Sequence, residues 1–308
     1  MAARSADQSA DRLRIIMFTN IPGGRAYTMV DAAVRPAGHR IVGVVTTPGP
    51  PKRRSDSYLD VVAAVPPGID VIVTSHPSRL AAMLAPLAPD LIISGGFPWL
   101  IPEDVLTLPR LGTINLHPAP LPRYRGPFPI EWAFRNDDPE LGFTVHRMAG
   151  AFDTGAILAQ GHVPIHDDDE PGDVLGRLPP LMQALLGHAI ERVIRGEPGD
   201  EQDDNQASYA GPFEPAWRIV DWSQPARTIH NQVRSWTGIR DMPLGAIGAI
   251  DGEQVNVIRT RLIVGDGDSP ASGSAGTVLR RDGDQLVVQC GDAPLELLNW
   301  TRVADTPA

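Results

Sequence analysis

Asn115 and His117 stand two residues apart in GTINLH (112–117), where a short apolar stretch ends. Side chains two residues apart on an extended backbone share one face, so this amide and this imidazole can both donate hydrogen bonds to one oxygen atom. Two such donors stabilise the negative charge that develops on an acyl oxygen during acyl transfer. Taken alone, the pair also fits an ordinary hydrogen-bond network at a strand end, and that alternative stays open.

Asp153, in RMAGAFDTGAIL (147–158), is the best candidate for the proton acceptor that such a reaction needs. It is a single acid after an apolar stretch, and Thr154 and Gly155 allow a turn that directs its carboxylate back; a plain turn-forming role is the alternative. Acyl transfer from an amide-like donor needs a site for the oxyanion and a proton relay, but neither a metal nor a covalent nucleophile. We therefore predict no metal site.

The residues around these candidates predict how they are positioned. Short β-branched stretches separated by helix-like segments predict an α/β domain with a doubly wound, mostly parallel sheet covered on both faces. In such a sheet, ligands bind beyond the carboxyl ends of the strands. The predicted strands are 13–18, 39–46, 70–75, 90–96 and 112–117. Four prolines, at positions 118, 120, 122 and 127, follow the last of them and predict a stiff loop that fixes Asn115 and His117.

Composition divides the chain further. We expect a disordered tail at 1–12, a first domain at 13–196, an acidic linker rich in Pro and Gly at 197–215, and a small C-terminal β-barrel or sandwich at 216–308. A helix at about 171–195 is expected to be interrupted at Pro179-Pro180, because proline lacks an amide donor.

The overall composition excludes several classes of protein. The net charge of −10 disfavours a protein whose main task is to coat nucleic acid. The single cysteine, Cys290, excludes an intrachain disulfide framework and a Cys-rich zinc site, and it fits a cytoplasmic location. No stretch is apolar enough for a secretory signal or a membrane span. His162 and His166, beside the acidic residues 167–170, are expected to form a solvated loop, not a metal site.

Two motifs carry a family resemblance. INLHPAPLPRYRGPFPIEWAF (114–134) and GFTVHRMAGAFDTGAILAQ (142–160) together resemble the folate-dependent formyltransferases, with a two-domain layout like that of the methionyl-tRNA formyltransferases. The resemblance implies a Rossmann-like formyltransferase domain followed by an OB-like barrel. It also implies that Asn115 and His117 hold the formyl oxygen of 10-formyltetrahydrofolate. Asp153 would orient His117 or a water and help to move a proton from the attacking amine to the folate nitrogen that leaves.

The resemblance implies further binding residues. The segment from Gly95 to Leu100 and the loop leading to Asp153 would line the pterin site, through Gly95, Gly96, Phe97, Trp99, Leu100, Ala151 and Phe152. The residues proposed to contact the acceptor are Asn20, Arg123, Tyr124 and Arg125, and surface packing is an equal alternative for the last three. Trp236 and Trp300 fit either a homodimer interface or, preferably, core packing.

The acceptor is the least determined part of the prediction. Relatives that formylate initiator tRNA typically carry a basic, glycine-rich insertion after the second strand, whereas the segment here (46–60) is short and holds only one basic run, Lys52-Arg53-Arg54. Residues 208–308 hold nine arginines against twelve acidic residues. A surface that binds tRNA needs positive charge, because phosphate contacts dominate such affinity. We therefore expect a small biosynthetic amine, of the amino sugar or hydroxyornithine type. Methionyl-tRNA, hydrolysis with water as acceptor, and a non-catalytic folate-binding module stay open as alternatives.

Overall fold

The computed structural model describes residues 12–51, 54–237, 245–263 and 273–303. All of the predicted tail except Arg12, together with Lys52 and Arg53 of the basic run, lies outside the described residues. The chain forms two compact units. The first unit comprises Met1–Arg125, Gly142–His162 and Leu178–Ser208, and the second comprises Gly126–Leu141, Val163–Arg177 and Tyr209–Ala308.

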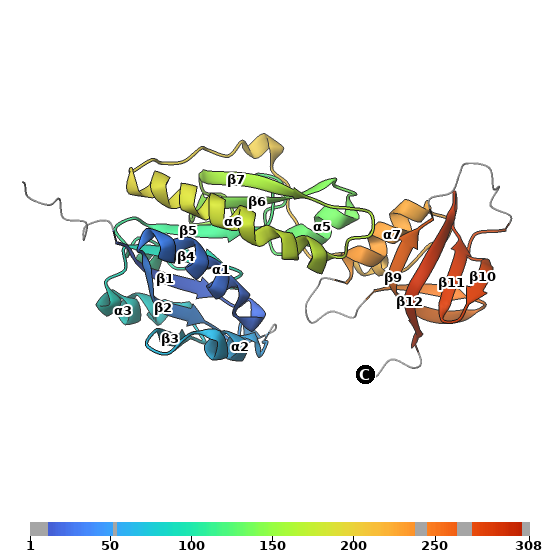
Figure 1. Cartoon of the computed structure of the whole chain (residues 1–308), viewed down its shortest axis with the longest axis horizontal. Coiled ribbons are helices and arrows are strands. Elements are labelled where there is room, and N and C mark those ends of the chain that lie inside the picture. The colour runs from blue at the N-terminus through green and yellow to red at the C-terminus, as the bar shows by residue number, and fades with distance from the viewer. Residues whose placement is uncertain (1–11, 52–53, 238–244, 264–272, 304–308) are drawn as a thin grey trace, which may run out of the picture. The chain divides into compact units, whose positions relative to one another are not determined.

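A seven-stranded sheet organises the first unit (Figure 1). Its order is β3-β2-β1-β4-β5-β6-β7, in which β1 to β5 pair in parallel and β6 runs antiparallel to β5. The strands are β1 (Arg14–Thr19), β2 (Arg40–Thr46), β3 (Asp70–Val73), β4 (Leu91–Gly95), β5 (Thr113–His117), β6 (Glu140–Arg147) and β7 (Ile157–Pro164). The prediction of a doubly wound, mostly parallel sheet is confirmed.

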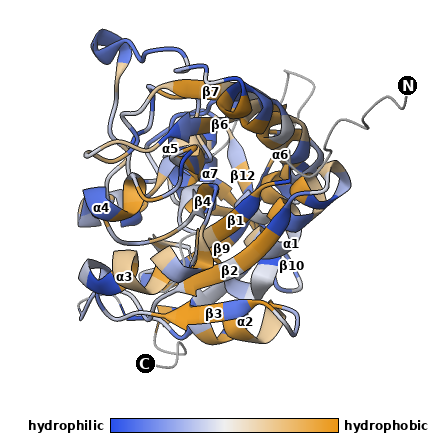
Figure 2. Cartoon of the chain, turned by 90° about the vertical axis from the view of Figure 1, so that its left-hand side faces the viewer, coloured by the Kyte–Doolittle hydropathy of each residue, from blue (hydrophilic) through white to orange (hydrophobic). Residues whose placement is uncertain are grey.

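Helices follow the strands and bury both faces of this sheet. They are α1 (Arg25–Val34), α2 (Ser57–Ala64), α3 (Leu80–Leu84), α4 (Glu103–Leu106) and α6 (Pro171–Ile194). Short 3-10 turns in this unit span Pro22–Gly24, Arg35–Ala37, Pro77–Arg79, Ala85–Leu87 and Asp204–Gln206, and another spans Pro215–Arg218 in the second unit. Figure 2 shows β1 and β2 as largely hydrophobic, as strands covered on both faces must be. Ile16 and Phe18 of β1, for example, pack with Leu80, Leu84 and Val105 of the helices.

The expected interruption at Pro179-Pro180 is wrong, since α6 is continuous from Pro171 to Ile194 and contains both prolines. The missing amides remove two hydrogen bonds, but the buried stripe of Val174, Leu178 and Met182 continues past them. Packing of that stripe therefore offsets the local cost of the prolines.

Within the part of the chain that the structure describes, no helix is long and apolar enough to cross a membrane.

The second unit is built on a five-stranded sheet of order β10-β11-β12-β9-β8, and each neighbouring pair is antiparallel. Its strands are β8 (Ala246–Ile250), β9 (Glu253–Leu262), β10 (Val278–Asp282), β11 (Gln285–Gln289) and β12 (Pro294–Arg302). Helix α7 (Ala226–Ser235) packs against both β9 and α5 (Pro129–Arg135). The expected small C-terminal β domain is thus confirmed. Trp236 is buried in its core, and Trp300 packs against that core.

The segment predicted as a linker makes ordered contacts. Asp200 forms an antiparallel bridge with Ile157, through two backbone hydrogen bonds of 2.7 and 2.8 Å. Arg147 donates hydrogen bonds to the carbonyl oxygens of Glu197 (2.6 Å) and Pro198 (2.9 Å). Residues 197–208, called the strap from here on, therefore belong to the first unit.

Candidate active site

The structure brings Asn115, His117 and Asp153 together, as their types and spacing predicted. Asn115 and His117 extend from the same face of β5, and both approach one carboxylate oxygen, Oδ1 of Asp153. The distance from Asn115 Nδ2 to this oxygen is 3.4 Å, and from His117 Nδ1 it is 3.6 Å. The side chains of His117 and Asp153 expose only 7% and 9% of their surface, so water screens the pair weakly.

The pairing of β5 with β6 adds His146, a residue that the sequence analysis missed. His146 lies directly opposite Asn115 in the antiparallel register. Its Nδ1 is 2.8 Å from the carbonyl oxygen of Arg147, which can only accept, so Nδ1 carries the proton. Nε2 is therefore free to accept a hydrogen bond from Asn115 Nδ2 at 3.1 Å, and it also lies 3.5 Å from Asp153 Oδ1. His146 thus fixes which way the Asn115 amide points.

The hydrogen bonds of His117 leave one ring nitrogen available. Nε2 donates to the carbonyl oxygen of Tyr124 at 2.8 Å, which orients the ring and leaves Nδ1 facing Asp153. Burial lowers the pKa of His117 below its usual 6.5, and the carboxylate of Asp153 opposes this effect. The imidazole is therefore neutral at pH 7, with an unprotonated Nδ1 directed at the site, so His117 can accept a proton there and can donate to the formyl oxygen, as the resemblance implies, only after it has taken one up.

The Asp153 carboxylate is placed by a strained turn. Asp153 has a φ of +57°, in the left-handed region that residues other than glycine rarely adopt. Gly155 follows two residues later, and a Cβ there would lie only 1.8 Å from the carbonyl oxygen of Arg147. The turn can therefore close tightly on the end of β6 only with glycine at this position.

The proline-rich loop holds the site from the other side, and the predicted acceptor residues have structural partners there. Tyr124 is buried, and its backbone amide donates to Ser208 Oγ at 2.9 Å. Arg123 Nη2 donates to the Tyr124 hydroxyl at 2.8 Å, while the Arg125 guanidinium donates to Gln202 Oε1 and Asp204 Oδ1. These contacts stiffen the loop around the carbonyl group that holds His117. Contact of Arg123, Tyr124 and Arg125 with an acceptor remains a prediction.

The residues predicted at the ends of β1 and β4 lie side by side. Asn20 Oδ1 accepts a hydrogen bond from Thr46 Oγ1 at 3.1 Å. Gly96 has a φ of +68°, and a Cβ there would meet the Ile21 side chain at 2.6 Å, so the segments after β1 and β4 approach closely. Gly95, which ends β4, is buried.

The remaining predicted folate residues differ in how they are held. Phe97 packs edge-on against Phe18 with ring centres 5.1 Å apart, and Trp99 Nε1 donates to Thr47 Oγ1 at 3.2 Å. Leu100 and Phe152 are 45% and 53% exposed, and Ala151, which precedes Phe152, is also exposed. Large exposed apolar side chains of this kind are available to pack against a ligand.

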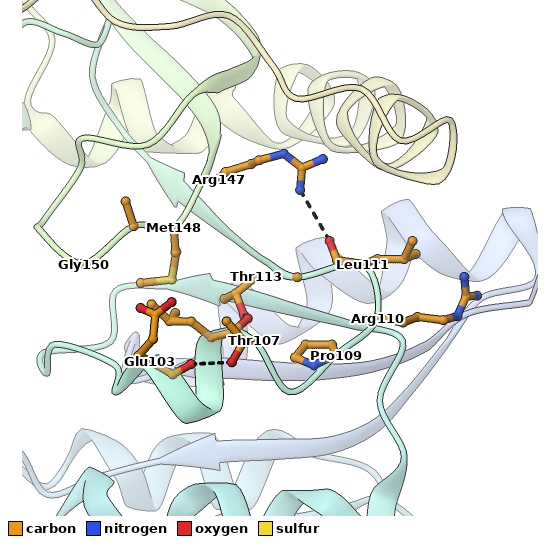
Figure 3. A pocket seen from close by; sticks show the side chains of 12 residues that line it. Glu103, Thr107, Pro109, Arg110, Leu111, Thr113, Arg147, Met148 and Gly150 are labelled. Carbon is orange, nitrogen blue, oxygen red and sulfur yellow. Dashed lines mark hydrogen bonds between the residues drawn. The ribbon is translucent and has the colours of Figure 1, made fainter.

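A cavity of about 600 Å³ opens beside the Asp153 loop (Figure 3). Its walls come from α4 and the turn that follows it, from the start of β5, and from the residues after β6; Glu103, Thr113, Met148 and Gly150 are among them. In Figure 3 the Met148 side chain points toward Glu103 and Thr107. None of the seven predicted folate residues lines the cavity, but Gly150 directly precedes Ala151 and Phe152.

Comparisons with known proteins agree over both units. Residues 14–190 match the family model described as formyl transferase, and residues 213–304 match the model described as formyl transferase, C-terminal domain. A methionyl-tRNA formyltransferase of Pelobacter propionicus is 33% identical over 295 residues, which cover 92% of this chain and 86% of the relative. A methionyl-tRNA formyltransferase of Thiobacillus denitrificans is 34% identical, with coverage of 92% and 90%.

Solved structures share the fold at lower identity. HypX from Aquifex aeolicus, in complex with tetrahydrofolic acid, superposes with a TM-score of 0.66 at 18% identity. This match covers 95% of the present chain but only 44% of HypX, so the chain spans less than half of that protein. A sugar N-formyltransferase from a Shewanella species has a TM-score of 0.60 at 17% identity, with coverage of 82% and 99%.

Proposed function

We propose that this chain, which belongs to the formyl transferase family, delivers a formyl group to the amino group of methionyl-tRNA. Its family membership makes it an enzyme that transfers the formyl group of 10-formyltetrahydrofolate. The observation that carries the proposed acceptor is the match to methionyl-tRNA formyltransferases at 33–34% identity across both family domains. The match extends over the C-terminal domain as well as the formyl transferase domain, so it compares the whole two-domain layout.

The proposed chemistry starts with Asn115. One hydrogen of its Nδ2 is held by His146 Nε2 at 3.1 Å, whereas the other faces Asp153 Oδ1 at the longer distance of 3.4 Å. The longer contact is the one that Asn115 can exchange for the formyl oxygen. Donation to that oxygen stabilises the charge that develops on it as the amine attacks, an effect typically about 10²–10³ in rate.

His117 and Asp153 then manage the proton. The amine nitrogen forms a bond to the formyl carbon, the bond from that carbon to the folate nitrogen breaks, and one proton passes from the amine to the leaving nitrogen. Nδ1 of His117 is the unprotonated nitrogen that faces the site, so it is suited to accept this proton and return it. The Asp153 carboxylate, 3.6 Å away, stabilises the imidazolium in between.

The cavity beside the Asp153 loop is the proposed pterin site. Its volume of about 600 Å³ is typical of ligand pockets. Arg147 to Gly150 line it, and the same loop continues to Asp153. Leu100 and Phe152 do not line this cavity, so their contacts with folate stay a separate prediction.

A small amine remains the second candidate acceptor, because acidic side chains neutralise part of the positive charge on the described residues of the second unit. Arg281 pairs with Asp251, and Arg302 lies 2.9 Å from Glu253. Paired arginines attract phosphate less strongly than free ones. The likeness to a sugar N-formyltransferase adds no weight to this candidate, because at 17% identity it shows only the fold.

Single-turnover formyl transfer tests the proposal. Charged initiator methionyl-tRNA, a panel of amino sugar nucleotides and hydroxyornithine would each be offered with 10-formyltetrahydrofolate, and mass spectrometry would detect the gain of one formyl group. Formylation of the tRNA-borne methionine, weakened steeply by salt, is the expected result. Formylation of a small amine alone would replace the acceptor but keep the chemistry. Release of formate with every acceptor would favour hydrolysis, and binding without turnover would favour a folate-binding module.

A further inference from the structure

We propose that Gln202, in the strap, is a positioning residue that ties the loop carrying Asp153 to the loop that holds His117. This inference rests on the proposed roles of Asp153 and His117. The side chain lies between two loops that are far apart in sequence, and its amide contacts both of them.

One end of the Gln202 amide fixes the Asp153 turn. Nε2 donates hydrogen bonds to the carbonyl oxygens of Asp153 and Gly155, each at 2.8 Å. These two carbonyl groups flank the turn in which Asp153 adopts its left-handed backbone conformation. Such a conformation persists only where the surroundings hold it. The two hydrogen bonds therefore help to keep the carboxylate directed at Asn115 and His117.

The other end of the amide fixes the proline-rich loop. Oε1 accepts hydrogen bonds from Arg125 Nε at 3.0 Å and from Arg125 Nη2 at 2.7 Å. Arg125 directly follows Tyr124, whose carbonyl oxygen accepts the hydrogen bond that orients His117. A shift of Arg125 would therefore move the group that sets the position of Nδ1.

The chemistry of the side chain suits this double role. A primary amide has two N–H donors and an oxygen with two lone pairs, and Gln202 uses all four. Glutamate has the same shape but cannot donate to the carbonyl groups of Asp153 and Gly155. Leucine can neither donate nor accept. Substitution at this one position can therefore release one loop or both.

The strap is anchored independently of Gln202, so these variants are expected to fold. Asp200 pairs with the backbone of Ile157 and with the guanidinium of Arg192 at 2.9 Å. Arg147 donates to two carbonyl groups at the start of the strap. Gln206, further along the strap, is exposed and donates to Asp203 within the strap itself (2.9 Å). Gln206→Glu is therefore a matched control for Gln202→Glu.

Steady-state formyl transfer by the full-length enzyme is the first test. Gln202→Glu is expected to lower kcat by about tenfold or more, with KM for 10-formyltetrahydrofolate changed by less than about threefold, because it disturbs orientation and not binding. Gln206→Glu should retain the wild-type kcat. Arg125→Met should also lower kcat, and the loss in the double variant should be smaller than the product of the two single losses. A Gln202→Glu kcat within twofold of wild type, or fully multiplicative losses, would overturn the coupling.

A second test needs no acceptor, so it separates this inference from the proposed function. NMR of the imidazole nitrogens follows the titration of His117 in the free enzyme. In Gln202→Leu the Asp153 carboxylate should move away, and the pKa of His117 should fall by about half a pH unit or more. Gln206→Leu should leave it unchanged. An unaltered His117 titration in Gln202→Leu would contradict the inference, whereas a wild-type enzyme inactive with every acceptor would contradict only the proposed function.

Discussion

Two buried imidazoles, one in each unit, share the same kind of hydrogen bond at Nε2 but have different partners at Nδ1. His117 and His230 both donate a hydrogen bond from Nε2 to a backbone carbonyl oxygen, of Tyr124 at 2.8 Å and of Asp167 at 2.7 Å. Burial lowers the pKa of both rings, and that of His230 reaches about 4. Nδ1 of His230 accepts from Thr260 Oγ1 at 2.8 Å, whereas Nδ1 of His117 faces the Asp153 carboxylate at 3.6 Å.

The comparison teaches that burial and a lowered pKa do not by themselves identify a reactive histidine. Both nitrogens of His230 have satisfied partners, so the ring is a structural bridge from α7 to β9 and to residue 167. Nδ1 of His117 has a charged neighbour beyond hydrogen-bond distance, so it can take up a proton. The partner of the second nitrogen decides between structure and chemistry.

Removal of the His117 imidazole is expected to have the largest effect. His117→Ala should lower kcat by about 10³, since loss of a proton carrier typically costs about 10²–10⁴. The free energy of unfolding should fall much less than the loss of kcat implies. Single-turnover kinetics and denaturant unfolding of the same preparation measure both quantities. Turnover within threefold of wild type would remove His117 from the proposed chemistry.

Removal of the His230 imidazole in the second unit should have the opposite effect, with a large loss of stability and little loss of kcat. His230→Leu leaves the Thr260 hydroxyl without its acceptor and removes one of two donors to the Asp167 carbonyl, which keeps Arg234 Nη1 at 3.1 Å, so the free energy of unfolding should fall by about 2–3 kcal/mol. Formyl transfer at low temperature should stay within about twofold of wild type. Five of the six tryptophans lie in the second unit, so tryptophan fluorescence reports its unfolding. A large loss of kcat in a variant that still folds would contradict a purely structural role for His230.

The stability that His230 contributes should depend on pH. The pKa of His230 in the folded chain, about 4, lies below its ordinary value of 6.5, so its stabilising effect is present above pH 6.5 and is lost as the pH falls toward 4. The difference in unfolding free energy between wild type and His230→Leu should therefore shrink by up to about 3 kcal/mol over that interval. Glu131, whose pKa burial raises to about 7, acts in the opposite direction but cancels in this difference. Denaturant titrations at several pH values would show it, and a constant difference would contradict the assignment.

The sequence predicted the sheet and the shared face of Asn115 and His117 because both follow from local patterns. Apolar strands alternate with helical segments, and Asn115 and His117 share a face because β strands repeat every two residues. His146 was missed because its role depends on the register between β5 and β6, which no local pattern contains. The signal available was a histidine in GFTVHRM, a stretch otherwise apolar enough to be buried.

The strap shows a second limit. Its acidic composition favours backbone outside long helices and strands, and at 197–208 the structure has one bridge at Asp200 and a short 3-10 turn over Asp204–Gln206. The partners of Gln202 in the Asp153 loop are backbone carbonyl groups, which every residue carries, so composition says nothing of them. In α6 the local signal was clear but misleading. Two prolines predicted an interruption, yet the tertiary packing of Val174, Leu178 and Met182 keeps the helix continuous.

The smallest expected effect belongs to His146, which accepts a hydrogen bond from Asn115, lies 3.5 Å from Asp153 Oδ1 and meets the His117 ring edge-on. His146→Phe keeps a ring of similar size but removes the acceptor for Asn115 Nδ2, so the amide loses its fixed orientation but not its donors. We therefore expect kcat to fall by about tenfold, less than the 10²–10³ of a lost oxyanion donor. His146→Gln restores an acceptor and should recover part of the rate. If the Phe variant were as slow as Asn115→Ala, His146 would itself take part in the proton transfer.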